Sequence, residues 1–321
     1  MNLYFNSEPF ITTAENWALT KTGHDNIYVK AMKRVDCLRS ISFTLNRKSL
    51  EKLYISYIRP LLEYADVLWH NCSASCSEKL EKVQISAARV VTGATRHVST
   101  RLLLEEVGWE SLSSRREKHK LVLMYKIMNG LSPSYLESRL PPEAHNYYNL
   151  RHVADIPPIY SRTTLRQKSF FPATIDLWNN LDIETRNSET LSIFKARLRR
   201  PLVVTPKHYF VGCRKGQILH TRLRLECSSL NDHLFKHNLV DNCKCACGHP
   251  RETTTHFFFH CTLFNRHRLE CFRQIPRVFK HDTSTFLFGD THVAEDQNCE
   301  LFTIIQKYIM QTKRFWTGFS F

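Results

Sequence analysis

The sequence predicts a mainly α-helical protein with a helical region, a proline-rich connection and a small cysteine- and histidine-rich module flanked by helices. Three observations lead to this prediction. Apolar residues recur at helical spacing from about residue 27 to residue 130. Six of the twelve prolines fall between residues 133 and 172, where they disfavour long helices. Five of the eleven cysteines lie between residues 243 and 271, among histidines.

These patterns divide the chain into five parts. We expect an irregular lead-in over 1–26, a helical region over 27–145, a proline- and aromatic-rich connection over 146–205, the cysteine–histidine module over 206–275, and a C-terminal helical segment over 276–321.

Helix boundaries in the first half are marked by residues with known terminal preferences. Pro60 should kink or divide the helix that follows Ser49, because proline cannot donate the interior hydrogen bond. Ser75 and Glu78 have capping-box spacing at the start of the next helix, and Gly93 favours its end.

Four further helices are expected: 100–107 ending at Gly108, 111–129 closed by Gly130, about 192–199, and 299–315. The second of these should expose a basic face, which either is simply solvated or contacts phosphate. That face carries Arg115, Arg116, Lys118 and Lys120.

Aromatic and cationic residues alternate through the proline-rich connection. Such residues stack bases and bind phosphate, or they form a satellite core under the connection, and both readings stay open. The aromatic residues are Tyr147, Tyr148, Tyr160, Phe170, Phe171 and Trp178.

The formal net charge of +15 favours a polyanionic partner, RNA or DNA. Basic residues that lie close together are stronger candidates for phosphate binding than scattered ones. We therefore take two basic clusters as the candidate nucleic-acid-binding residues. They are Lys195, Arg197, Arg199 and Arg200, and Arg214, Lys215, Arg222 and Arg224. No apolar run is long enough to span a membrane, and the first residues do not resemble a signal peptide.

The strongest chemical signal is the set Cys245, Cys247, His256 and Cys261. Three thiolates and one imidazole form a closed four-ligand set, which suits a structural zinc ion and leaves no position for a catalytic water. The first pair is one residue tighter than the usual spacing, so Cys243 is an alternative to Cys245. This cysteine usage indicates an intracellular, reducing compartment, with nucleus and cytoplasm not distinguished.

Several segments, in order, resemble the C-terminal region of non-LTR retrotransposon reverse transcriptases, jockey-like elements especially. They are Tyr57-Ile58-Arg59-Pro60-Leu61-Leu62-Glu63-Tyr64-Ala65 with Trp69, Leu80-Glu81-Lys82-Val83-Gln84, Ala87-Ala88-Arg89, Thr92-Gly93, Val107-Gly108-Trp109, Tyr148-Asn149-Leu150-Arg151, Ser161-Arg162-Thr163, Trp178-Asn179-Asn180-Leu181, Phe194-Lys195, and the zinc-binding segment Cys245-Ala246-Cys247-Gly248 with Glu252-Thr253, His256-Phe257 and Cys261.

The resemblance implies a thumb-like helical region after the polymerase palm, a connection and a nucleic-acid-gripping tail. The palm and endonuclease domains would belong to the parent polypeptide. The chain contains no Asp-Asp dipeptide, and a polymerase palm needs paired carboxylates to hold two metal ions. Tyr64-Ala65-Asp66-Val67 is similar to the family's aromatic-Ala-Asp-Asp motif, but Val67 cannot bind a metal. We therefore assign no catalytic residues and expect the chain to be inactive alone.

The leading hypothesis is that the chain is a fragment of an RNA-directed DNA polymerase, and two other functions are alternatives to it. One is a domesticated adaptor whose zinc segment binds another protein and has no nucleic-acid role. The other is a metal-dependent nuclease that uses His233, His237 and His256, which lack a recognisable catalytic frame.

Overall fold

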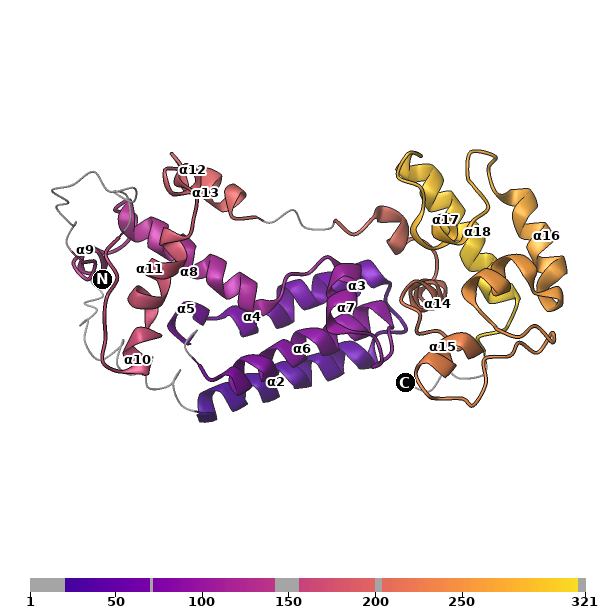
Figure 1. Ribbon diagram of the computed structural model, residues 1–321, viewed down its shortest axis with the longest axis horizontal. Helices are drawn as coiled ribbons and strands as arrows, with labels where there is room; N and C mark the ends of the chain where they lie inside the picture. The colour runs from indigo at the N-terminus through magenta and orange to yellow at the C-terminus, as the bar shows by residue number, and fades with distance from the viewer. Residues whose placement is uncertain (1–20, 70–71, 142–155, 200–203, 317–321) are drawn as a thin grey trace. The chain divides into compact units, whose positions relative to one another are not determined.

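The computed structural model describes residues 21–69, 72–141, 156–199 and 204–316, and these residues form helices and connections with no strand among them (Figure 1). The mainly α prediction is confirmed. No helix within these ranges has the length and hydrophobicity that a membrane span requires.

The chain folds into two compact units, each built from segments that are distant in sequence. Unit 1 comprises Met1–Met32, Arg59–Val83 and Glu110–Leu202, and unit 2 comprises Lys33–Ile58, Gln84–Trp109 and Val203–Phe321. The five linear parts expected from the sequence stay a prediction.

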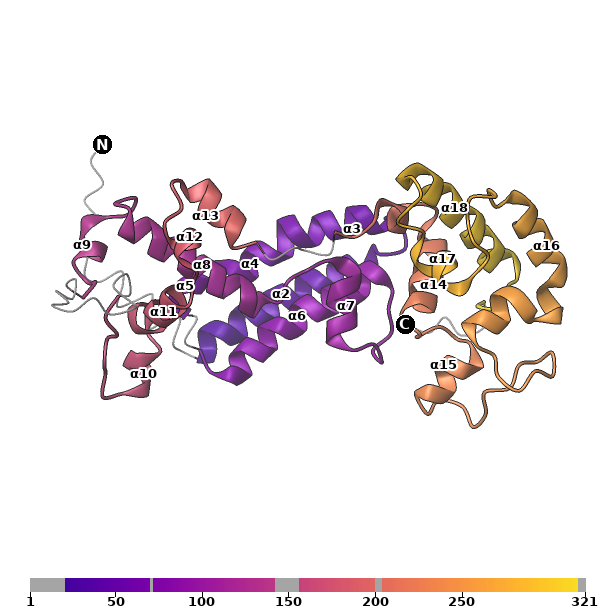
Figure 2. The same ribbon diagram turned by 45° about the horizontal axis from the view of Figure 1, so that its top comes forward.

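Helices α2 (Lys21–Ser40) and α6 (Ala74–Thr92) contribute residues to both units (Figure 2). Helix α2 begins at Lys21, whereas the sequence pattern placed the first helical residue near Ile27. Of the expected lead-in, residues 1–20 lie outside the described residues.

The helix that we expected after Ser49 begins at Arg47 and is capped by Asn46, and it is divided before Pro60 as that proline predicted. It consists of α3 (Arg47–Leu53), a π-helical turn η1 (Tyr54–Ile58) and α4 (Arg59–Glu63). Pro60 is the second residue of α4, and the wider π turn precedes it because proline removes one backbone donor and displaces the preceding carbonyl.

Serine and glycine define the next helices largely as expected. Ser99 caps α7 (Thr100–Val107), which ends at the left-handed Gly108, and Ser111 caps α8 (Leu112–Met128). The cap of α6 differs from the prediction, since the Ser73 hydroxyl, and not that of Ser75, accepts the backbone N–H of Cys76 at 3.3 Å.

Unit 1 is held by an aromatic core where α8, α11 (Phe170–Asn179) and α13 (Leu191–Arg197) pack together. The Tyr125 ring stacks on Phe194 at a centroid distance of 4.5 Å, and Trp178 lies 5.7 Å from Phe194. Trp178 therefore serves packing, whereas Tyr160 is exposed and Tyr147 and Tyr148 lie outside the described residues.

Short helices accompany this core. Helices α9 (Ser134–Glu137) and α10 (Thr164–Gln167) lie between residues 133 and 172, where the prolines predicted that long helices would not form. Helices α5 (Asp66–Trp69) and α12 (Ile183–Arg186) lie outside that range.

The prediction of an exposed basic face on α8 is wrong. Arg116 and Lys120 are buried, and Arg115 and Lys118 are half-buried. Arg116 donates to the Ser77 hydroxyl at 2.5 Å and lies over the Trp69 ring, and burial lowers the pKa of Lys120 to about 8. Arg115 and Lys118 form ion pairs with Glu63 and Glu110.

Unit 2 has a larger core, formed where α14 (Arg214–Arg224) and α18 (Glu295–Gln311) pack against each other and contact α17 (Thr283–Phe288), while α16 (Asn265–Gln274) packs on α18 (Figure 2). The expected apolar face of α18 is buried here, although the helix begins four residues earlier than predicted. The remaining elements of this part are η2 (Lys207–Phe210), α15 (Asn231–Lys236), η3 (His256–His260) and η4 (Thr262–Phe264).

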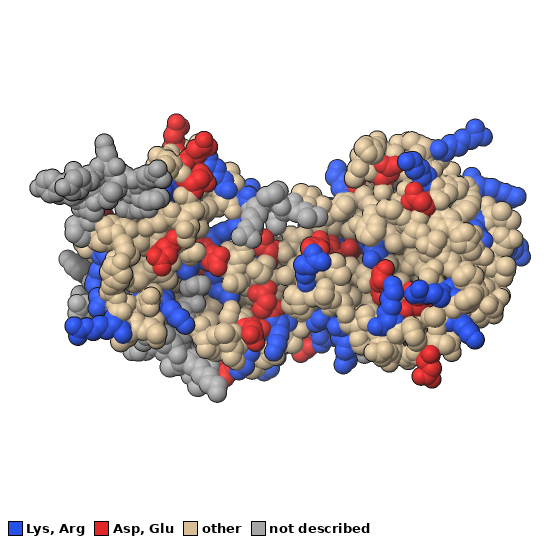
Figure 3. Space-filling view, in the orientation of Figure 1, with Lys and Arg blue, Asp and Glu red and all other residues tan. Residues whose placement is uncertain are grey.

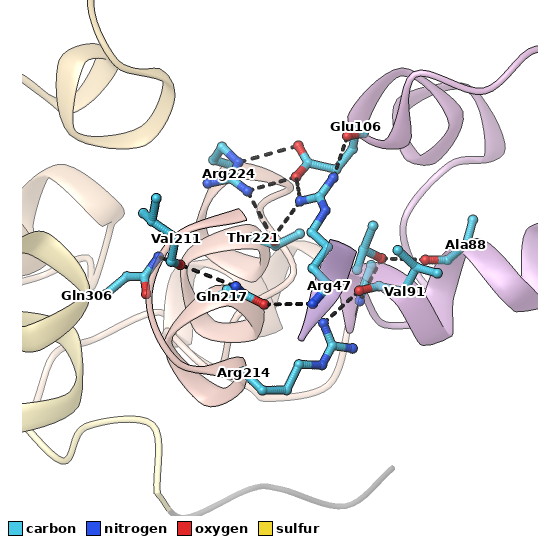
Figure 4. Close-up of polar contacts among 12 residues, drawn as sticks. Arg47, Ala88, Val91, Glu106, Val211, Arg214, Gln217, Thr221, Arg224 and Gln306 are labelled. Atoms are coloured by element: carbon cyan, nitrogen blue, oxygen red, sulfur yellow. Dashed lines mark hydrogen bonds and ion pairs between the residues drawn. The ribbon is translucent and has the colours of Figure 1, made fainter. Parts of the chain in front are cut away.

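A buried ion network joins three segments of unit 2 (Figure 4). The Glu106 carboxylate accepts hydrogen bonds from Arg47 and Arg224, each at 2.7 Å. Thr221 accepts from Arg224 at 2.9 Å, and Gln217 accepts the backbone N–H of Arg47 at 3.0 Å. Burial alone would raise the pKa of Glu106, but the two arginine charges outweigh it and lower that pKa below its ordinary value.

We expect Glu106→Ala to lower the free energy of unfolding of unit 2 by roughly 3–5 kcal/mol, because two guanidinium groups would stay buried without their anion. Urea denaturation measures this change. The matched control is Glu105→Ala, since Glu105 is exposed and pairs only with the exposed Arg101. The control should cost less than about 1 kcal/mol. Equal effects of the two substitutions would contradict the assigned role of Glu106.

Candidate metal centre

The first two candidate ligands lie on a tight backbone loop. The Cys245 N–H donates to the carbonyl of His249 at 2.9 Å, and the Gly248 N–H donates to the carbonyl of Cys245 at 3.0 Å. Gly248 has φ +92°, a left-handed conformation that glycine adopts without strain. The loop closes with the Glu252 N–H donating to the Cys243 carbonyl at 2.7 Å.

The other two candidate ligands begin and end a π-helical turn. In η3 the Cys261 N–H donates to the carbonyl of His256 at 2.8 Å, five residues earlier. The wider turn of a π-helix brings these two residues together, and such turns are frequent at functional sites. Phe257 and Phe258, inside the turn, are buried in the core of unit 2 and hold it in place.

These segments bring together the four ligands chosen from the sequence. The Sγ atoms of Cys245 and Cys261 are 3.7 Å apart, and Cys247 Sγ lies 3.2 Å from His256 Nε2. One ligand atom from each of the four residues lies within 4.8 Å of the others, so the cluster can hold a metal ion. Cys243 is not in this group, and its Sγ faces the Pro250 carbonyl instead.

Burial and local hydrogen bonds set the protonation of the thiols. Burial raises the pKa of Cys245 to about 12 and also raises that of Cys261. The backbone N–H of His249 lowers the pKa of Cys247. A cation is needed to keep the two buried sulfurs as thiolates, the form that binds metal.

Two arginines surround the cluster without being ligands. Arg268 on α16 donates to the carbonyl groups of Phe259 (2.9 Å) and Cys261. Arg314 forms two hydrogen bonds of 2.6 Å with Glu252, whose carboxylate lies 3.9 Å from Cys245 Sγ. Neither arginine was predicted from the sequence, because no local pattern distinguishes them from the other basic residues.

Three of the candidate nucleic-acid-binding cations are engaged by the protein itself. Arg214 is buried and donates to the carbonyl groups of Ser42 and Val90. It also donates to the carbonyl group of Val91 (Figure 4). Arg224 binds Glu106, and Arg222 donates to the Gly93 carbonyl at 2.8 Å.

The remaining candidate cations are more accessible. Lys195, Arg197 and Arg199 are exposed, although Arg197 donates to the Glu184 carbonyl. Lys215 is half-buried beside Trp316, and Arg200 lies outside the described residues.

The three histidines of the nuclease alternative have different surroundings. His256 belongs to the metal cluster, His233 lies between the Ser228 and Thr254 hydroxyls at 2.8 and 3.2 Å, and His237 stacks on His97 at 5.0 Å. His233 and His237 are not in the group that can hold a metal.

Asp66, the acid of the palm-like Tyr64-Ala65-Asp66-Val67 segment, has a partner within unit 1. Its carboxylate is buried and lies 2.6 Å from His119 Nδ1. Asp66 is thus in contact with another side chain of the same unit.

Comparison with protein-family models, with curated proteins and with solved structures gives no match for this chain.

The buried His233 generates a prediction about pH. Burial lowers its pKa from 6.5 to about 4, so between these values the unfolded chain binds more protons than the folded one. The free energy of unfolding should therefore fall as the pH is lowered from about 6.5 to about 4, by up to ~3 kcal/mol from this residue. Urea denaturation across this range should show a flatter profile for His233→Gln. The control His292→Gln removes an exposed histidine and should keep the wild-type profile.

Proposed function

We propose that this chain corresponds to the post-palm, C-terminal region of a non-LTR retrotransposon reverse transcriptase, with no polymerase activity of its own. In this proposal unit 2 holds one structural zinc ion and binds RNA or DNA. The observation that carries the proposal is the convergence of Cys245, Cys247, His256 and Cys261 at one point. The ordered segments that resemble this family support it.

The distances of the cluster support zinc as the metal. Tetrahedral zinc with Zn–S bonds of ~2.3 Å separates two sulfurs by about 3.8 Å. The Cys245–Cys261 separation of 3.7 Å is close to that value. Three thiolates and one imidazole also suit zinc better than magnesium or calcium, because thiolate sulfur and imidazole nitrogen bind zinc and the other two ions prefer oxygen ligands.

The role proposed for zinc is structural. Four protein ligands complete a tetrahedron and leave no open position for water or substrate. His256 Nε2 faces Cys247, so the ring would coordinate through that atom. When bound, the ion would fix the loop around Gly248 against the π turn.

An exposed tryptophan beside lysines supports nucleic-acid binding. Trp316 is 53 % exposed, and the ammonium group of Lys215 lies 3.8 Å from its ring centroid, with that of Lys313 at 5.9 Å. Aromatic rings next to cations bind single strands by base stacking and phosphate contact. Lys215 is thus the candidate cation whose surroundings best suit this role.

The zinc proposal predicts about one zinc ion per chain in metal analysis, as one four-ligand set implies. Cys245→Ser should lose most of this zinc, because the substitution removes a thiolate ligand. Cys243→Ser is the matched control and should retain it. Removing the metal with a chelator should lower the melting temperature of the wild type and leave that of Cys245→Ser almost unchanged. Retention of zinc by Cys245→Ser together with its loss from Cys243→Ser would instead support the alternative ligand.

The nucleic-acid proposal predicts that Trp316→Ala weakens binding of a fluorescent single-stranded oligouridylate by about 10-fold, because one stacked base is lost. Fluorescence anisotropy at several salt concentrations measures this change. Tyr135→Ala is the matched control, since Tyr135 is 48 % exposed, and it should bind like the wild type. Affinity that does not fall as salt rises would count against phosphate contacts and favour the adaptor alternative.

A further inference from the structure

Helix α16 presents an exposed stripe on the side opposite its packed face. Arg268 and Cys271 are buried against the rest of unit 2. Arg266, Leu269 and Arg273 are exposed on α16, and their spacing of three and four residues places them along one helical face. The exposed Leu263 precedes them in η4. The stripe therefore alternates aliphatic and cationic side chains.

The basic character of this surface continues past the end of the helix. Arg277, Val278 and Lys280 are exposed in the connection that follows α16. Lysine and arginine side chains project from the edge of unit 2 that carries α16 (Figure 3). We name the exposed residues together the α16 face: Leu263, Arg266, Leu269, Arg273, Arg277, Val278 and Lys280.

The cations of the α16 face are not neutralised by ion pairs. Within the described part of the chain, the side chains of its three arginines and Lys280 have no carboxylate within ion-pair distance and no hydrogen-bond acceptor. Glu270 lies on the same side of the helix and pairs with neither Arg266 nor Arg273. These cations contrast with Arg47, Arg214 and Arg224 of the same unit, which are engaged by protein acceptors.

The aliphatic residues of this face indicate which kind of negatively charged partner would fit it. Leu263, Leu269 and Val278 are 57 %, 52 % and 51 % exposed. Single exposed leucines are ordinary, but here three lie among four unpaired cations. A phosphate backbone offers no apolar group to cover them, whereas an amphipathic peptide offers carboxylates and aliphatic side chains at matching helical intervals.

We propose that the α16 face binds an acidic amphipathic helix of a protein partner. Carboxylates of the partner bind the arginines, which receive them through two parallel hydrogen bonds, and aliphatic side chains of the partner cover Leu263 and Leu269. This proposal does not depend on nucleic-acid binding at Trp316, because the two surfaces share no residue.

The test uses the full chain and a fluorescein-labelled peptide of about 18 residues, long enough to form a helix, with leucine and glutamate at amphipathic spacing. A scrambled peptide of the same composition is the reference. We expect the amphipathic peptide to bind with a Kd of about 10 µM and the scrambled one at least about 10-fold more weakly. Equal affinity of the two peptides would overturn the proposal.

Two substitutions with matched controls locate the binding surface. The double variant Arg273→Glu, Arg277→Glu should weaken peptide binding by at least about 10-fold, and Lys48→Glu, Lys52→Glu, the same charge change at exposed residues of α3, should not. Leu269→Ser should weaken binding about 5-fold. Leu239→Ser removes an equally exposed leucine, at 52 %, and should have no effect. Unchanged melting temperature and zinc content show that each variant is folded.

The same variants distinguish a peptide surface from a nucleic-acid surface. If the Arg273→Glu, Arg277→Glu variant loses oligouridylate binding while the peptide binds neither this variant nor the wild type, the α16 face is a phosphate surface and the proposal is wrong. If oligouridylate does not bind even the wild type while the peptide does, the proposed nucleic-acid function fails and the α16 proposal stands.

Discussion

One carboxylate, that of Glu106, connects the three chain segments that form unit 2. It lies on α7 between Arg47 of α3 and Arg224 of α14, so residues separated by more than a hundred positions meet at one buried anion. Desolvating three charges is costly, and hydrogen bonds to the Thr221 hydroxyl and the Glu106 carbonyl offset part of that cost, although the buried Arg47 Nε has no hydrogen-bond partner among the described residues. Apolar side chains still pack together after small shifts of the backbone. The hydrogen bonds of this network form only when each of the three segments is in one position along its axis. It thereby specifies how α14 lies against the N-terminal helices of its own unit.

The candidate metal cluster depends on the helical core of unit 2, whereas that core does not depend on the cluster. Its π turn inserts Phe257 and Phe258 into a core formed by α14, α16, α17 and α18, and Tyr308 of α18 donates to the Phe257 carbonyl at 2.9 Å. Three backbone hydrogen bonds close the loop around Gly248, but this loop is not part of any helix in the described residues. A bound ion would therefore stabilise the loop and the π turn locally, while the helical core provides the platform on which the four ligands meet.

Local sequence signals predicted the features whose causes are local. Gly108, Ser111 and Gly130 mark helix ends because capping needs only neighbouring residues. The four residues that could hold a metal ion were likewise recognisable, because spacing and donor type are properties of a short segment. The burial of Arg214 and Arg224 was not predictable in this way, since their acceptors lie on distant segments. Choosing Cys245 over Cys243 also required the backbone hydrogen bonds of the loop.

Charge explains why arginines accompany a cluster of this kind. With a divalent ion bound, three thiolates and the ion would carry a net charge of −1, and the cluster lies in a largely buried environment where that charge would be costly. Arg268 and Arg314 contribute two positive charges nearby, and Glu252 contributes one negative charge. The group of ligands, ion and these three side chains would then be neutral. Arg268 and Arg314, which are part of the net charge of +15, would compensate these internal anions and would not be available to an external polyanion. The strength of binding to such a partner should therefore follow the number of exposed, unpaired cations rather than the formal charge of the sequence.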